Sequence, residues 1–111
     1  MKVNVRQYGR VAVVDIPGNI THGEGDVAMK AAVQDLIDNG NTSVILNLEK
    51  TAYMDSAGIG ELVACHKRVV DKGGRLKLVK MNQKVLDLFT ITKLIQLFDT
   101  FDDEKEAIAS F

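Results

Sequence analysis

The chain has 111 residues, of which 46% are hydrophobic, and its 14 basic and 15 acidic residues give a net charge of −1. This length and apolar content predict one domain, residues 1–111, with a core that needs no disulfide or metal. The balanced charge argues against nucleic-acid binding, which requires an excess of basic residues. The single cysteine, Cys65, excludes an intramolecular disulfide and a cysteine-cluster metal site, and it fits a reducing compartment.

No signal peptide or membrane-spanning segment is expected. Charged and amide side chains interrupt the first residues before an apolar stretch forms. The apolar run at residues 11–14 is far shorter than the roughly 20 residues of a membrane helix. We therefore expect a cytoplasmic protein without a membrane partner.

The N-terminal part of the chain predicts a β-hairpin. Residues 3–8 alternate in character, and residues 11–16 are rich in β-branched side chains, which is typical of strands. The short connection Gly9-Arg10 favours an antiparallel turn. Pro17 ends the second strand because proline cannot donate a ladder hydrogen bond. Residues 18–25 then form a loop with room for one brief strand.

Helical and extended segments alternate through the rest of the chain. Apolar residues at helical spacing indicate helices that begin near residues 26, 56, 82 and 102. Apolar runs indicate strands at residues 43–48, 75–79 and 95–101. The predicted fold is therefore α/β, with a mixed, mainly parallel sheet, an antiparallel N-terminal hairpin and about four helices. The first of these helices is expected to bury Val27, Ala28, Ala31, Ala32, Leu36 and Ile37, and the last to bury Ala107, Ile108 and Phe111.

Residues 53–60, with the sequence Tyr-Met-Asp-Ser-Ala-Gly-Ile-Gly, hold the most conspicuous local chemistry of the chain. Asp55 or Ser56 can cap the helix that follows by accepting from its free N–H groups, which is worth about 1 kcal/mol. A serine here also lies at the carboxyl end of a central strand, where open α/β sheets place functional groups. These residues alone leave both capping and a functional serine open.

Enzyme and cofactor sites fit this stretch poorly. Gly58 and Gly60 lack the remaining elements of a dinucleotide fingerprint, and no Walker A sequence occurs. Ser56 lacks the G-x-S-x-G flanks of a hydrolase elbow, although His22 or His66 could serve as its base. A metal site would need both histidines with nearby carboxylates, at a spacing that matches no known pattern. We expect no enzyme activity, no cofactor and no metal, and a small Ser56 hydrolase is the alternative from another functional class.

The same stretch, following the run Val-Ile-Leu-Asn-Leu at residues 44–48, closely resembles the signature of the STAS domain. More narrowly, it is similar to the bacterial anti-sigma factor antagonists, in which a strand leads to a D-S/T-x-G motif at the start of the second main helix. The resemblance covers nearly the whole chain, including the hairpin, the Gly73-Gly74 pair and the closing helix. It implies the STAS fold and a protein that catalyses nothing itself.

The resemblance also implies a switch at Ser56. In this family an anti-sigma factor, which is also a serine kinase, phosphorylates that serine, and a metal-dependent serine phosphatase resets it. The unphosphorylated antagonist binds the anti-sigma factor and frees the sigma factor. Asp55, Ala57, Gly58 and Ile59 are then expected to contact the partner, with the small Ala57 and Gly58 letting the kinase approach closely. The antagonist is expected to be a monomer or a weak dimer.

One loop departs from the family pattern. Sigma-regulating members usually read G-E-L-D or G-E-I-D after the second strand, whereas residues 18–21 here read Gly-Asn-Ile-Thr. Asn19 and Thr21 therefore occupy the glutamate and aspartate positions of the expected partner contact. Thr21 is either a second phosphate acceptor or a mark of a different partner. The alternative within the family is a scaffold subunit of a stressosome-like assembly or of a transporter complex.

Overall fold

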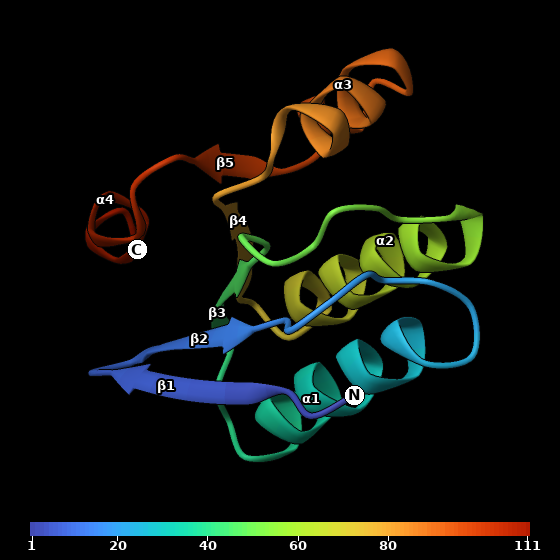
Figure 1. Ribbon diagram of the computed structural model, residues 1–111. Coiled ribbons are helices and arrows are strands. Elements are labelled where there is room, and N and C mark those ends of the chain that lie inside the picture. The colour runs from blue at the N-terminus through green and yellow to red at the C-terminus, as the bar shows by residue number, and fades with distance from the viewer.

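The computed structural model describes all 111 residues of the chain. The strands are β1 (Asn4–Tyr8), β2 (Val11–Asp15), β3 (Ser43–Asn47), β4 (Arg75–Val79) and β5 (Asp99–Phe101). The helices are α1 (Gly25–Asp38), α2 (Ser56–Asp71), α3 (Gln83–Ile91) and α4 (Glu104–Ala109), and a 3-10 turn, η1, spans Leu94–Gln96. Figure 1 shows these elements in chain order from blue to red.

All five strands form one sheet in the spatial order β1-β2-β3-β4-β5. β1 and β2 pair antiparallel, with Tyr8 opposite Val11, and the remaining pairs are parallel. Gly9 has a φ of 59° in the connecting turn, a backbone conformation that glycine adopts without steric cost. The predicted α/β class, with a mainly parallel sheet, an N-terminal hairpin and four helices, is confirmed.

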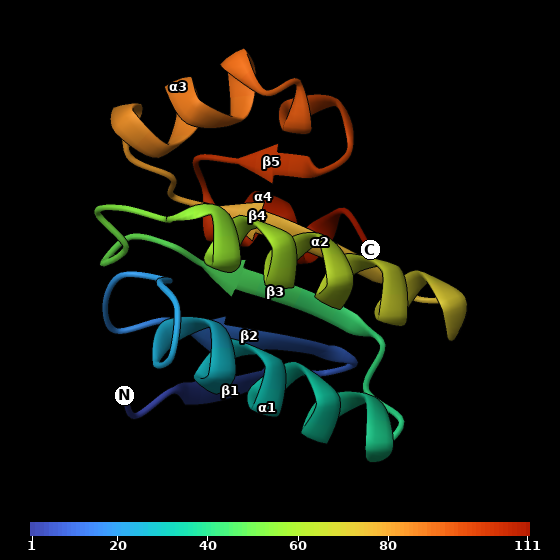
Figure 2. The same cartoon turned by 90° about the vertical axis from the view of Figure 1, so that its right-hand side faces the viewer.

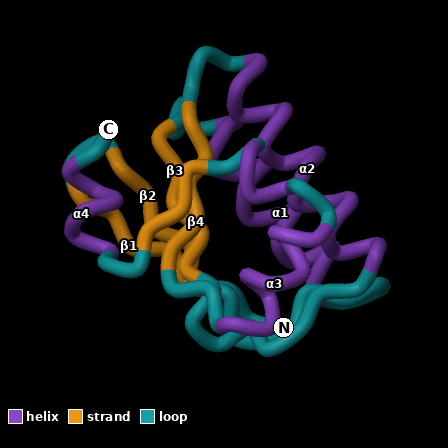
Figure 3. The backbone as a smooth tube through the Cα atoms, turned by 90° about the horizontal axis from the view of Figure 1, so that it is seen from above, coloured by secondary structure: helices purple, strands orange, loops and turns teal.

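The sheet separates two cores of unequal size. α1, α2 and α3 lie on one side of it and the short α4 lies on the other (Figure 3). α1 and α2 run next to each other across β2, β3 and β4 (Figure 2). Along β3, Val44 and Leu46 face the larger core beneath these helices, while Ile45 faces the smaller core beneath α4. Successive strand side chains point to opposite faces, so β3 is buried on both.

The last strand begins later than the sequence predicts. The expected strand at residues 95–101 is wrong for its first half, because Leu94–Gln96 forms η1. Lys93 precedes this turn with a left-handed backbone, φ 62°, which breaks the extended path. Phe98 is nevertheless buried, and only Asp99–Phe101 pairs with β4.

Two predicted helix faces also need correction. In α1 the buried side is Gly25, Met29, Val33, Leu36 and Ile37, whereas the predicted Val27 is 59% exposed. The prediction gave alanines the same weight as larger side chains. Met29 and Val33 bury more apolar area than alanine does, and they set the buried face of α1. At the other end of the chain, Ala107 is buried but Phe111 is 39% exposed. No helix of the chain has the length and the apolar character needed to cross a bilayer.

Candidate functional site

The stretch at residues 53–60 lies at the carboxyl ends of the parallel strands, on the side of the sheet that α1 and α2 cover. β3 ends at Asn47, and Ser56 is the first residue of α2. Asp55 is the N-cap, and its Oδ1 accepts a hydrogen bond from the Gly58 amide at 2.8 Å. The Ser56 side chain is exposed and makes no hydrogen bond within the chain. The cap is therefore supplied by Asp55, and the serine hydroxyl is left free.

The first turn of α2 offers unsatisfied backbone donors next to this hydroxyl. The Gly58 amide is taken by the Asp55 side chain, and the Ile59 amide donates to the Asp55 carbonyl at 2.9 Å. The amides of Ser56 and Ala57, which precede them, have no acceptor inside the helix. These N–H groups lie at the positive end of the helix dipole and favour an anion at this position.

Asp55 also connects α2 to the loop before α1. Its second carboxylate oxygen accepts from the His22 amide at 2.9 Å. Hydrogen bonds from the amides of His22 and Gly58 together hold the pKa of Asp55 below its ordinary value. The carboxylate therefore stays ionised and joins two loops that are more than thirty residues apart in sequence.

Asn19 forms a second connection between the same loops. Its side-chain oxygen accepts from the amides of Ala52 and Tyr53 at 3.0 and 3.1 Å. Next to it, Ile20 pairs with Met54 in an isolated parallel bridge, and the Ile20 amide donates to the Tyr53 carbonyl at 3.2 Å. This bridge is the brief strand for which the sequence left room. The two loops that surround Ser56 are thus held together by both main-chain and side-chain bonds.

Gly58 has a structural reason to lack a side chain. A Cβ at this position would collide with the backbone carbonyl of Ile20, and Gly58 is buried. Only a glycine lets the first turn of α2 approach the Ile20 loop this closely. The small size of Gly58 therefore serves packing within the domain, and its contact with a partner stays a prediction. Gly60, by contrast, is exposed and faces open space.

The remaining predicted contact residues surround Ser56 with different exposures. Ala57 and Ile59 are half-buried, and Ile59 packs against the larger core. Thr21 is also half-buried, and its carbonyl accepts from the Asp26 amide at 3.2 Å. All of the predicted residues thus lie in the first turn of α2 or in the loop tied to it, but the buried share of each differs.

An apolar groove beside the site was missed by the sequence analysis. Ala52, Tyr53 and Met54 form one side of it, and Val85, Leu88 and Ile91 of α3 form the other. Its volume is about 240 Å³. Tyr53 is 45% exposed and Ile91 is 80% exposed, so large apolar surface faces solvent here. The sequence signal for this groove was Ile91, an apolar residue that does not lie on the buried face of α3.

Neither histidine is arranged to activate Ser56. The His22 side chain is 85% exposed, and its Nδ1 lies 3.9 Å from Asp26 Oδ2. His66 lies about three turns further along α2, with its ring 4.9 Å from that of Phe98. Burial lowers the pKa of His66, and its buried Nδ1 has no hydrogen-bond partner. The geometry therefore contains no serine–histidine pair.

Cys65, the other potential nucleophile on α2, is fully buried in the core as a small apolar side chain. Burial raises the pKa of its thiol to about 12. The thiol is therefore protonated and unreactive at neutral pH, because the thiolate is the nucleophilic form.

Comparison with known proteins gives a consistent set of relatives. The anti-sigma-B factor antagonist of Bacillus subtilis is 32% identical over 99 residues, covering 89% of each chain. An anti-sigma-factor antagonist (STAS) domain protein from Planctomyces limnophilus superposes with a TM-score of 0.85 at 17% identity, covering 97% of this chain and 96% of that one. The Bacillus cell fate determinant SpoIIAA in its phosphorylated form superposes with a TM-score of 0.74 at 22% identity, covering 98% of both chains.

The matched region includes all five strands, three of the helices and most of the fourth. Residues 2–107 match the sequence profile of the STAS domain, which spans the sheet, α1, α2 and α3 and most of α4. The structural relatives share this fold over nearly the full chain. The chain therefore belongs to the STAS domain family.

Proposed function

We propose that the chain is a cytoplasmic, single-domain anti-sigma factor antagonist, residues 1–111, that acts by binding and not by catalysis. The observation that carries the proposal is the Ser56 hydroxyl, which is exposed and free of internal hydrogen bonds at the unsatisfied first turn of α2. Relatives named as anti-sigma factor antagonists support it. In this proposal an anti-sigma factor that is also a serine kinase phosphorylates Ser56, and a metal-dependent serine phosphatase removes the phosphate.

The environment of Ser56 suits a phosphate that changes binding and leaves the fold intact. A phosphate adds about −1.5 to −2 charges at pH 7. The amides of Ser56 and Ala57 can donate to it, which offsets part of the cost of placing a dianion beside the ionised Asp55. Because no buried group changes its partner, the change is confined to the surface that a partner contacts. A partner shaped for a hydroxyl then meets both a steric and an electrostatic clash.

The partner surface in this proposal combines Ser56 with its half-buried neighbours. Ala57, Ile59 and Thr21 supply direct contacts, and the apolar groove between Tyr53 and Ile91 supplies further area. Asn19, Asp55 and Gly58 belong to the same surface, and their bonds to the two loops set its shape. A rigid, pre-formed surface loses little conformational entropy on binding.

Direct binding to the purified anti-sigma kinase of the same host tests the switch. Ser56→Ala should bind as tightly as the unmodified chain but should not be released by ATP. Ser56→Asp should bind at least tenfold more weakly, which corresponds to about 1.4 kcal/mol. Ser43→Ala, at the opposite end of β3, is the matched control and should behave like the unmodified chain. Equal affinity of Ser56→Ala and Ser56→Asp would remove the proposed switch.

The threonine at position 21 is the reason to consider a second function. It stands where sigma-regulating members carry an aspartate, next to the site and partly accessible. A STAS scaffold subunit of a stressosome-like or transporter complex is the corresponding alternative. Copurification from the native host followed by mass spectrometry separates the two, because recovery of an ATP-binding serine kinase supports the antagonist. Recovery of scaffold or transporter subunits without such a kinase contradicts it.

A further inference from the structure

The largest hollow on the protein lies on the α4 side of the sheet, away from Ser56. It has a volume of about 840 Å³ and sits over the carboxyl ends of β2, β3 and β4. Ile16 is its one hydrophobic residue among the 13 that line it, and none of them is aromatic. Pockets of roughly 300–1,000 Å³ hold small-molecule ligands, and the carboxyl ends of strands are where open α/β sheets bind them.

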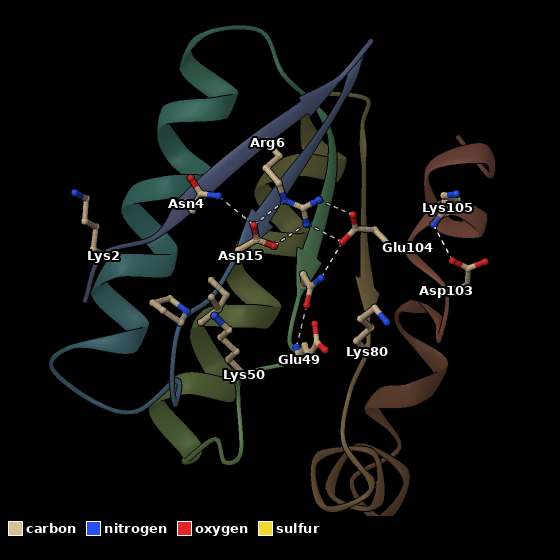
Figure 4. Close-up of a pocket in the computed structure, with 13 residues that line it drawn as sticks. Lys2, Asn4, Arg6, Asp15, Glu49, Lys50, Lys80, Asp103, Glu104 and Lys105 are labelled. Carbon is tan, nitrogen blue, oxygen red and sulfur yellow. Dashed lines mark hydrogen bonds and ion pairs between the residues drawn. The ribbon is translucent and has the colours of Figure 1, made fainter.

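The floor of this cavity is a closed network of ion pairs (Figure 4). Arg6 donates from Nε and Nη2 to Asp15 at 2.7 and 2.8 Å, and from Nη1 and Nη2 to Glu104, both at 2.7 Å. Its last donor goes to the Tyr8 hydroxyl at 2.8 Å. Asn47 Nδ2 donates to Glu104 Oε2 at 2.8 Å. These hydrogen bonds give the floor a fixed shape, and because Arg6 faces two carboxylates the floor carries one net negative charge.

Four lysines surround this floor and are unpaired. Their amino groups form no hydrogen bond or ion pair within the chain, and they are Lys2, Lys50, Lys80 and Lys105. The lining carboxylates outside the floor are Glu49 and Asp103, so the unpaired charge of the rim is positive although the chain as a whole is acidic. Figure 4 shows Lys50 and Lys80 on the same side of the Arg6–Glu104 network.

Lys80 is held at the rim by an uncommon backbone conformation. It follows β4 directly and has a φ of 58°, in the left-handed region that favours glycine. Its amide donates to the Phe101 carbonyl at 3.0 Å, which fixes the turn. Non-glycine residues in this region concentrate at functional sites, where the surrounding structure holds them.

We propose that this cavity binds a small, hydrophilic molecule that carries phosphate, such as a sugar phosphate. Lysine ammonium groups attract phosphate as point charges, and the four unpaired lysines of the rim are the groups left to bind it, because every donor of Arg6 is used within the floor. The absence of an aromatic side chain leaves no platform on which a nucleotide base could stack. With Ile16 as the one hydrophobic residue of the lining, the cavity is less suited to a lipid tail than to a hydrophilic ligand.

Titration of the full chain, followed by amide NMR shifts, tests this site with inorganic pyrophosphate, glucose 6-phosphate and ATP as probes. Pyrophosphate and glucose 6-phosphate should give saturable shifts at the amides of Lys50 and Lys80. The double variant Lys50→Gln/Lys80→Gln should bind them at least tenfold more weakly, that is, about 1.4 kcal/mol. The matched control Lys30→Gln/Lys67→Gln, on exposed positions of α1 and α2, should bind them unchanged.

Three results would overturn the proposal. Equal weakening in the two double variants would show that only overall charge matters. The absence of saturable shifts with pyrophosphate and glucose 6-phosphate would show that the cavity binds neither. Tighter binding of ATP, with shifts centred on the first turn of α2, would place the anion site at Ser56. If the double variant does not fold, Lys50→Gln and Lys80→Gln are measured singly, each with the same expected direction.

Discussion

The two sides of the sheet use their polar side chains differently at the carboxyl ends of the same strands. Around Ser56, Asn19 and Asp55 accept hydrogen bonds from backbone amides of neighbouring loops. On the α4 side, Arg6 and Glu104 pair with each other and with further side chains. The first arrangement fixes the loops and leaves a hydroxyl free. The second uses every donor of its arginine, so only the rim around it is left to bind a ligand.

Gly58→Ala should give the largest loss of stability, and the disruption should be confined to the loops around Ser56. The added methyl group would collide with the carbonyl of Ile20, which is backbone and can move only if the loop moves. We expect a loss of about 3 kcal/mol in the free energy of unfolding, as for overpacking of a tight interior. Urea denaturation measures it.

Gly60→Ala is the matched control for this substitution, two residues further along α2. Nothing lies near a Cβ at Gly60, and alanine favours a helix over glycine by about 1 kcal/mol. The control should therefore be neutral or slightly stabilising. A similar loss in both variants would mean that helix propensity, and not the approach to Ile20, governs this position.

Arg6→Met should disrupt the ion-pair network on the α4 side of the sheet and change the pH dependence of stability. The variant leaves Asp15 and Glu104 partly buried without their cation, and we expect a loss of about 2 kcal/mol at pH 7. In the unmodified chain, hydrogen bonds from Arg6 hold the pKa values of both carboxyls below their ordinary range. Their contribution is therefore complete above the unfolded-state pKa of about 4 and is lost as the pH falls through the folded-state values.

The pH dependence supplies the control for this prediction. Unfolding curves measured from pH 7 to pH 2 should show that the difference between Arg6→Met and the unmodified chain shrinks on the acid side. A difference that stays constant with pH would assign the loss to packing of the arginine stem. The proposed phosphorylation of Ser56 should proceed equally in both chains, because the network lies on the other face of the sheet.

Asn19→Ala should loosen the loops around Ser56, with a smaller loss of stability. The variant removes the acceptor of the Ala52 and Tyr53 amides, and we expect about 1 kcal/mol. Hydrogen exchange at these two amides should accelerate before exchange in β3 does. Asn19→Asp keeps an acceptor oxygen in place and should restore their protection. Slow exchange in the alanine variant would show that the Ile20–Met54 bridge holds the loops without this side chain.

The fold could be predicted from the sequence, but the long-range contacts on the two sides of the sheet could not. The alternation of strand and helix patterns was enough for the sheet, and the position of Ser56 after β3 followed from it. The cap by Asp55 was within reach of the sequence, but the bonds from the His22 amide to Asp55 and from the Ala52 amide to Asn19 were not, because each joins segments more than thirty residues apart. The Arg6–Glu104 pair joins residues 98 apart, and no local pattern marks it. Sequence pattern thus located Ser56 at the start of α2 but not the long-range contacts that hold the loops around it.

The apolar groove escaped prediction for the same reason, since its two sides come from the loop before α2 and from α3.

Ile91→Ser gives the smallest expected change in stability and the clearest separation of folding from binding. Because Ile91 is 80% exposed, the free energy of unfolding should change by less than about 0.5 kcal/mol. If the groove is part of the partner surface, affinity for the anti-sigma kinase should still fall about tenfold. Val27→Ser, on an apolar residue of α1 that is 59% exposed, is the control that should leave stability unchanged. Loss of affinity in Val27→Ser but not in Ile91→Ser would move the partner surface from α3 to α1.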